Sequence, residues 1–137
     1  MFKLIKMTGS RINVPEPEKL TLSTALTAKA GVPLSVTGGT ATVLSDTTTA
    51  LPTHILLKKA TAEKEVLAFR VTPGMIFEVP ASATPSAMTT GSEYVLSSDG
   101  EKVSATAVSS SKRGAVLVNK NGASATGDTL LVSFPAV

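Results

Sequence analysis

Residues 34–44 read Leu-Ser-Val-Thr-Gly-Gly-Thr-Ala-Thr-Val-Leu, and this stretch decides the fold class. Apolar and hydroxyl-bearing side chains alternate on both sides of Gly38-Gly39, which is the pattern of two half-buried strands. Two consecutive glycines supply the positive φ angles that a tight hairpin turn requires. We therefore predict a β-hairpin here.

The same signals recur outward from this hairpin. A second hairpin is predicted over residues 94–107, where Asp99-Gly100 joins two runs of alternating side chains. Further strands are predicted at residues 20–25, 75–79, 115–118 and 129–134, with turns at 72–74 and 121–122. Turn signals at intervals of about 8–12 residues favour a small all-β barrel or sandwich of about nine to eleven strands.

Two interpretations stay open for residues 55–69. Apolar runs lie at both ends of this segment, and good helix formers occupy residues 60–64, so a single amphipathic helix is possible. The flanking Pro52 and Pro73, and apolar residues gathered at the two ends, favour a strand, a turn and a second strand instead. We favour the hairpin.

Residues 1–18 are predicted to form an extended N-terminal arm outside the compact core, and residues 19–137 a β-rich domain. Lysines interrupt the apolar side chains of the first seven residues, and Pro15 and Pro17 forbid a helix. The length of the chain suits one domain without an internal linker.

The composition excludes several kinds of chemistry. The 137 residues include no Cys and one His, so thiolate metal sites, cysteine nucleophiles and multi-histidine metal centres are impossible. The single His54 is interpreted as an exposed or hydrogen-bonded structural residue, and Ser109 to Lys112 matches S-x-x-K by composition alone. The carboxylates fall mostly at predicted turns and strand ends. We therefore expect no enzyme activity, no cofactor and no metal.

Charge and aromatic content exclude two further classes. The net charge of +3 arises from basic and acidic residues mixed along the chain, without the basic and aromatic stripe that binds nucleic acid. No apolar run approaches the length of a membrane helix, and residues 1–10 are too interrupted by lysine to be a secretory signal. We expect a soluble protein that contacts neither nucleic acid nor membrane.

Two stretches resemble a known family. Residues 53–80, with Arg-Val-Thr-Pro-Gly-Met-Ile-Phe-Glu-Val at 70–79, resemble the small head-decoration, or capsid cement, proteins of tailed bacteriophages. The closing part is similar to them as well: Ala-Val-Leu-Val at 115–118 and then Gly-Asp-Thr-Leu-Leu-Val-Ser-Phe at 127–134. The resemblance covers about two thirds of the chain, and its short motifs specify structure rather than chemistry.

The resemblance implies a β-rich domain that binds the outside of the expanded head, after synthesis in the host cytoplasm. Such proteins often form trimers that clamp neighbouring major capsid subunits, and a mobile N-terminal arm commonly adds to a capsid strand. A strand added in this way gains affinity from its main chain and specificity from alternate side chains. The candidate capsid-binding residues in the matching segment are Phe2, Lys3, Leu4, Ile5, Lys6, Arg11, Ile12 and Val14.

Another virion or surface attachment module is the alternative. A tail or fibre domain of this kind would bind a host receptor or glycan through the loops at residues 81–91 or 45–49. A small enzyme is disfavoured, because its catalytic residues cannot be named. Strand order, the choice between barrel and sandwich, and the oligomeric state stay open.

Overall fold

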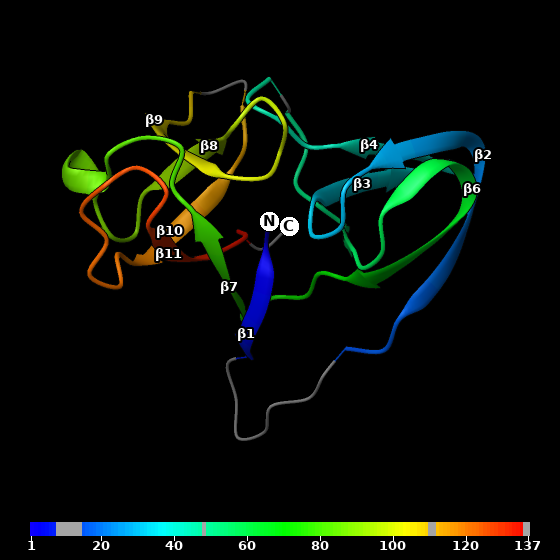
Figure 1. Cartoon of the computed structure of the whole chain (residues 1–137), viewed down its shortest axis with the longest axis horizontal. Helices are drawn as coiled ribbons and strands as arrows, with labels where there is room; N and C mark the ends of the chain where they lie inside the picture. The colour runs from blue at the N-terminus through cyan, green and yellow to red at the C-terminus, as the bar shows by residue number, and fades with distance from the viewer. Residues whose placement is uncertain (8–14, 48, 110–111, 136–137) are drawn as a thin grey trace.

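The computed structural model describes residues 1–7, 15–47, 49–109 and 112–135 (Figure 1). The part of the chain so described consists of strands, turns and one short 3-10 helix, which confirms the predicted all-β, single-domain class. The strands are β1 (Lys3–Met7), β2 (Glu18–Ala28), β3 (Pro33–Thr37), β4 (Thr40–Val43), β5 (His54–Leu56), β6 (Ala60–Arg70), β7 (Met75–Pro80), β8 (Glu93–Leu96), β9 (Val103–Ala107), β10 (Ala115–Asn119) and β11 (Thr129–Ser133), and the 3-10 helix is η1 (Pro85–Ala87).

The strands form two antiparallel sheets that lie side by side in Figure 1, the six-stranded one on the left. The six-stranded sheet has the order β1-β7-β11-β10-β8-β9 and combines the first strand with the C-terminal half of the chain. It curls so far that Val103 of β9 forms a parallel bridge with Ala81, directly after β7. The Ser82 N–H also donates to the Val103 carbonyl at 2.8 Å.

The five-stranded sheet, with the order β2-β6-β5-β3-β4, comes entirely from the segment between β1 and β7. It is nearly barrel-shaped, because β2 bends back toward the β3–β4 turn. At this closure the Ser23 N–H donates to the Gly39 carbonyl at 2.8 Å. Gly38 and Gly39 both have positive φ, so the predicted hairpin and the reason for its glycines are confirmed.

Two groups of buried side chains fill these sheets. The smaller group lies inside the five-stranded sheet and includes Leu22, Leu34 and Val66. The larger group lies under the six-stranded sheet, but Ile55 and Phe69 of the five-stranded sheet belong to it. The Phe69 ring stacks on Phe77 with centroids 6.3 Å apart, so the two sheets share a core.

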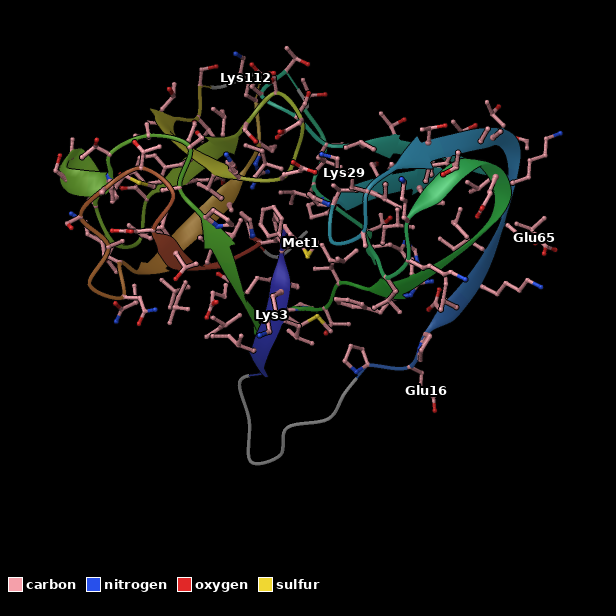
Figure 2. All side chains as sticks on the ribbon, viewed as in Figure 1. Met1, Lys3, Glu16, Lys29, Glu65 and Lys112 are labelled. Carbon is pink, nitrogen blue, oxygen red and sulfur yellow. The ribbon has the colours of Figure 1, made fainter. Side chains whose placement is uncertain are left out.

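Close contacts around the β8–β9 turn also join the sheets. A Cβ on Gly100 would lie 2.3 Å from the Leu44 carbonyl oxygen, so only glycine fits where this turn meets the end of β4. Beside it, Lys29 of the segment after β2 forms an ion pair with Glu101 at 3.3 Å. Lys29 lies at the junction of the two sheets (Figure 2). These contacts fix the relative position of the sheets.

The prediction that residues 1–18 form an arm outside the compact core is wrong. Residues 3–7 form β1, which pairs with β7 in the register Lys3 to Glu78 and Leu4 to Phe77. Phe2 is only 3% exposed, lies in the larger core and contacts the rings of Phe77 and Phe134. The other end of the predicted arm, Glu18, begins β2. Residues 8–14 lie outside the described residues.

The alternative for residues 55–69 is decided in favour of strands. β5 and β6 pair antiparallel, with Ile55 opposite Phe69, so the helix is excluded. The turn lies earlier than predicted, at residues 57–59, and the predicted turn residues 60–64 belong to β6. Ala62 has a φ of 53°, which marks the point where β6 bends with β2.

Candidate interaction surface

The first candidate surface is the free edge of β1. β1 ends the six-stranded sheet, so among the described residues no strand lies beside the edge turned away from β7, although the Phe2 N–H just before β1 donates to the Gly31 carbonyl at 2.8 Å. Such an edge is a template for an added strand. Lys3 is exposed and Ile5 is 38% exposed, whereas Leu4 packs against the larger core. The outward side chains on this strand are therefore Lys3, which Figure 2 labels, and Ile5.

The structure separates the predicted capsid-binding residues. Lys3, Leu4, Ile5 and Lys6 share β1, but Phe2 is committed to the core and cannot fill a pocket on a partner. Arg11, Ile12 and Val14 lie outside the described residues. Of the eight predicted residues, only Lys3 and Ile5 are thus shown with outward side chains on a free strand edge.

A second feature is a hydrogen-bonded cluster around His54. His54 is 4% exposed, and its Nε2–H donates to Glu18 Oε2 at 3.1 Å. Arg70 donates to the same carboxylate from Nε at 3.2 Å and from Nη2 at 3.4 Å. Hydrogen bonds from both partners hold the pKa of Glu18 below its ordinary value of 4.5, with the His54 contact the larger cause and Arg70 the next.

The Thr53 hydroxyl completes this cluster. Its Oγ1 lies 2.8 Å from His54 Nδ1 and 3.3 Å from the Leu34 carbonyl oxygen. A neutral His54 accepts the hydroxyl proton at Nδ1, whereas a protonated ring donates to Oγ1 and leaves the hydroxyl to Leu34. Both protonation states of His54 therefore keep every polar atom of the ring paired. The arrangement is that of a structural histidine that fastens β2 to β5 and β6.

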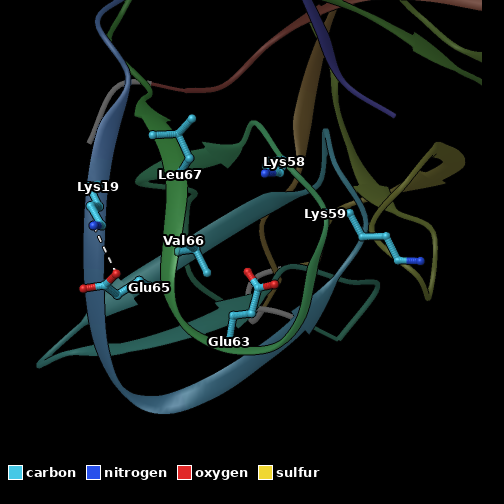
Figure 3. A pocket seen from close by; sticks show the side chains of 7 residues that line it. All are labelled: Lys19, Lys58, Lys59, Glu63, Glu65, Val66 and Leu67. Atoms are coloured by element: carbon cyan, nitrogen blue, oxygen red, sulfur yellow. Dashed lines mark ion pairs between the residues drawn. The ribbon is translucent and has the colours of Figure 1, made fainter.

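A third feature is a hollow of about 250 Å³ in the five-stranded sheet, where β6 continues past the end of β5. It lies between β6 and the loop that arches from β5 into β6 (Figure 3). Three lysines and two glutamates line it together with two apolar side chains: Lys19, Lys58, Lys59, Glu63, Glu65, Val66 and Leu67. Lys19 forms an ion pair with Glu65 at 3.1 Å.

The two loops predicted to bind a receptor or glycan, residues 81–91 and 45–49, differ in how they are anchored to the rest of the structure. In the 81–91 loop, Ala81, Pro85 and Met88 are buried, and the Thr89 N–H donates to the Tyr94 hydroxyl oxygen at 2.6 Å. This loop is therefore anchored to the core along its length. In the 45–49 loop, the Ser45 and Thr47 hydroxyls share a hydrogen bond of 3.1 Å.

Sequence reasoning missed the hollow and the partners of His54. Glu18 lies in the segment predicted to be an arm, and no local pattern indicates its contact with His54, 36 positions away. For the hollow a signal exists: Lys58-Lys59 follows directly after an apolar run and precedes Glu63 and Glu65. It becomes visible as a surface only when β6 is known to be a strand.

Comparison of the sequence with protein-family models and with curated proteins finds no match to this chain. Across the described ranges, no three His, Asp or Glu side chains gather closely enough to hold a metal ion. The same ranges contain no helix of the length and apolarity needed to cross a membrane. The surfaces described above are thus the features on which a function can be argued.

Proposed function

We propose that this chain is a capsid decoration protein, which binds the outside of an expanded bacteriophage head and stabilises contacts between major capsid subunits. In this proposal it acts as a trimer and works by fitting a surface rather than by catalysis. The resemblance of residues 53–80 and 127–134 to head-decoration proteins suggests the partner. The way these stretches fold together supports it.

One observation carries the proposal. The end of the first resembling stretch, β7, and the closing stretch, β11, are distant in sequence but pair in the six-stranded sheet, with Phe77 opposite Val132 and Val79 opposite Leu130. All four of these side chains are fully buried. The β7 and β11 parts of the resembling stretches thus pack against each other, as expected if the resemblance reflects a shared fold.

The free edge of β1 is the contact that this proposal assigns to the capsid. An extended capsid segment beside β1 would pair with its main chain and meet the outward side chains of Lys3 and Ile5. This replaces the arm predicted from the sequence, because Phe2 is held in the core. On a symmetric shell, several weak contacts of this kind add up through multivalency.

Co-sedimentation tests the proposal. The purified chain is mixed with expanded heads, and separately with unexpanded proheads, of the phage whose genome encodes it, and each mixture is separated on a density gradient. We expect saturable binding to expanded heads and none to proheads. Absence of binding to expanded heads would contradict the proposal, and binding to host cells or glycans instead would favour a tail or fibre module.

A further inference from the structure

We propose that the hollow beside Leu57 and Leu67 docks an extended acidic segment of a partner chain that carries an apolar side chain. The identity of that partner as the capsid protein rests on the proposed function. The recognition chemistry does not, because it follows from an apolar pair, from unpaired ammonium groups and from an interrupted strand ladder at the same place.

Leu57 and Leu67 form the exposed end of a row of apolar side chains on one face of β5 and β6. Ile55 and Phe69 lie opposite each other and are 1% and 6% exposed, because the six-stranded sheet covers them. Two residues further along, the Leu57 N–H donates to the Leu67 carbonyl at 2.9 Å, which continues the same register. Side chains two residues apart on a strand point to the same face. Leu57 and Leu67 therefore extend the row, but they are 40% and 38% exposed.

The charges around this pair are unbalanced. Lys19 lies opposite Leu67 on β2 and is paired with Glu65. Lys58 and Lys59 have no ion-pair partner in the part of the chain that the structure describes, and Glu63 is the remaining carboxylate of the hollow. Figure 3 shows both lysines on the arching loop, with the Lys59 side chain pointing away from β6, and the Lys19–Glu65 pair on the opposite side of β6. The net charge of the lining is positive, which favours an acidic partner.

The strand ladder stops at this point. On its loop side β6 is paired as far as Leu67, whose carbonyl accepts from Leu57. Main-chain groups of residues two apart on an antiparallel strand point to the same side. The N–H and C=O of Glu65 therefore also point toward the loop, where no strand of the described chain lies opposite them. An extended partner segment is the structure that pairs with such groups.

These features define the occupant. An apolar side chain of the partner covers Leu57 and Leu67, acidic side chains on either side meet Lys58 and Lys59, and the partner main chain lies along β6 at Glu65. The hollow of about 250 Å³ is far larger than a water site, so it admits a side chain. A basic segment would instead meet a lining of net positive charge.

The test is an NMR titration of the ¹⁵N-labelled full chain with a synthetic peptide that alternates aspartate and leucine. We expect chemical-shift changes at the amides of residues 57–59 and 63–67, and weaker binding as salt rises from about 0.05 M to about 0.5 M. Peptides that alternate lysine with leucine, or aspartate with serine, should bind more weakly. Shift changes confined to other parts of the chain would overturn the proposal.

Paired variants separate this surface from general charge effects. The variant K58E/K59E should bind the acidic peptide about tenfold more weakly or worse, and L67S should also weaken it. The control K3E/K102E has the same change of charge at two exposed lysines that do not line the hollow, and it should bind the acidic peptide as the unchanged chain does. A dispersed amide spectrum shows that each variant is folded. Equal binding by K58E/K59E and the control would overturn the proposal.

The same variants on expanded heads distinguish this inference from the proposed function. If the unchanged chain binds heads and K58E/K59E binds them equally well, the hollow does not dock the capsid and the decoration function stands. If the chain ignores heads while the acidic peptide maps to the hollow, the decoration function fails and the docking chemistry stands. The variant I5S, altered at the edge of β1, should keep full peptide binding.

Discussion

At the scale of single residues, the cluster of Glu18, His54 and Arg70 predicts how the stability of the fold depends on pH. The pKa of Glu18 is lowered in the folded chain, so its ionised form stabilises the fold above the unfolded value of about 4.5. That contribution is lost as the pH falls through the lower, folded pKa. We expect E18Q to unfold at a lower urea concentration than the unchanged chain at about pH 7, with the difference shrinking below about pH 4.5.

Urea unfolding at a series of pH values checks this prediction. The pKa values of Asp99 and Asp128 are also lowered, through hydrogen bonds from the Ser97 hydroxyl and from the Ser124 and Ala125 N–H groups respectively. The unchanged chain and E18Q therefore both lose stability as the pH falls. The loss is smaller in E18Q, because the contribution of Glu18 is absent from it. A difference between the two chains that stays constant from about pH 7 to about pH 3 would contradict the assigned role.

At the scale of elements, local signals predicted the hairpins and long-range pairing decided the rest. Gly38-Gly39 and Asp99-Gly100 mark their turns within a few residues, so β3–β4 and β8–β9 could be predicted from the sequence. β1 could not, because its partner β7 lies about seventy positions away and the intervening prolines favour an arm. Distance in sequence also hides the hollow, because Lys19 of β2 is about forty to fifty positions from the β5–β6 loop and the β6 residues that supply the rest of the lining.

The bend of β6 at Ala62 allows a prediction about the free energy of unfolding. Ala62 has a φ of 53°, a left-handed conformation that costs a residue with a Cβ about 1 kcal/mol. Its N–H donates to Thr27 Oγ1 at 3.0 Å, which holds the bend against β2. A62G removes the strain but makes the unfolded chain more flexible, so we expect the free energy of unfolding to rise by about 0.5 kcal/mol.

Thermal and urea unfolding measure this change. The matched control is A60G in the same strand, where the alanine is buried and has no positive φ. Losing that Cβ should lower the free energy of unfolding by about 1 kcal/mol. If A62G is as destabilising as A60G, the left-handed conformation is not a source of strain and the bend is set by packing alone.

At the scale of the whole molecule, the shared core predicts that the two sheets unfold together. Phe69 belongs to the five-stranded sheet, but its ring stacks on Phe77 inside the core of the six-stranded sheet. F69A removes that contact and should lower the free energy of unfolding by about 3–5 kcal/mol. Leu22 lies in the smaller core, so L22A should lower it by about 2–5 kcal/mol.

Two probes follow the sheets separately in these variants. Tyr94 is the only tyrosine in a chain without tryptophan, so its fluorescence reports the six-stranded sheet. Amide signals of β3 and β4 report the five-stranded sheet. The two sheets are coupled by Phe69, by Gly100 and by the Lys29–Glu101 pair. L22A should therefore shift the unfolding transitions seen by both probes equally, although Leu22 lies in the five-stranded sheet only. A shift of the β3 and β4 signals alone would mean that the sheets are independent units, and a surface on one of them could then rearrange on binding without disturbing the other.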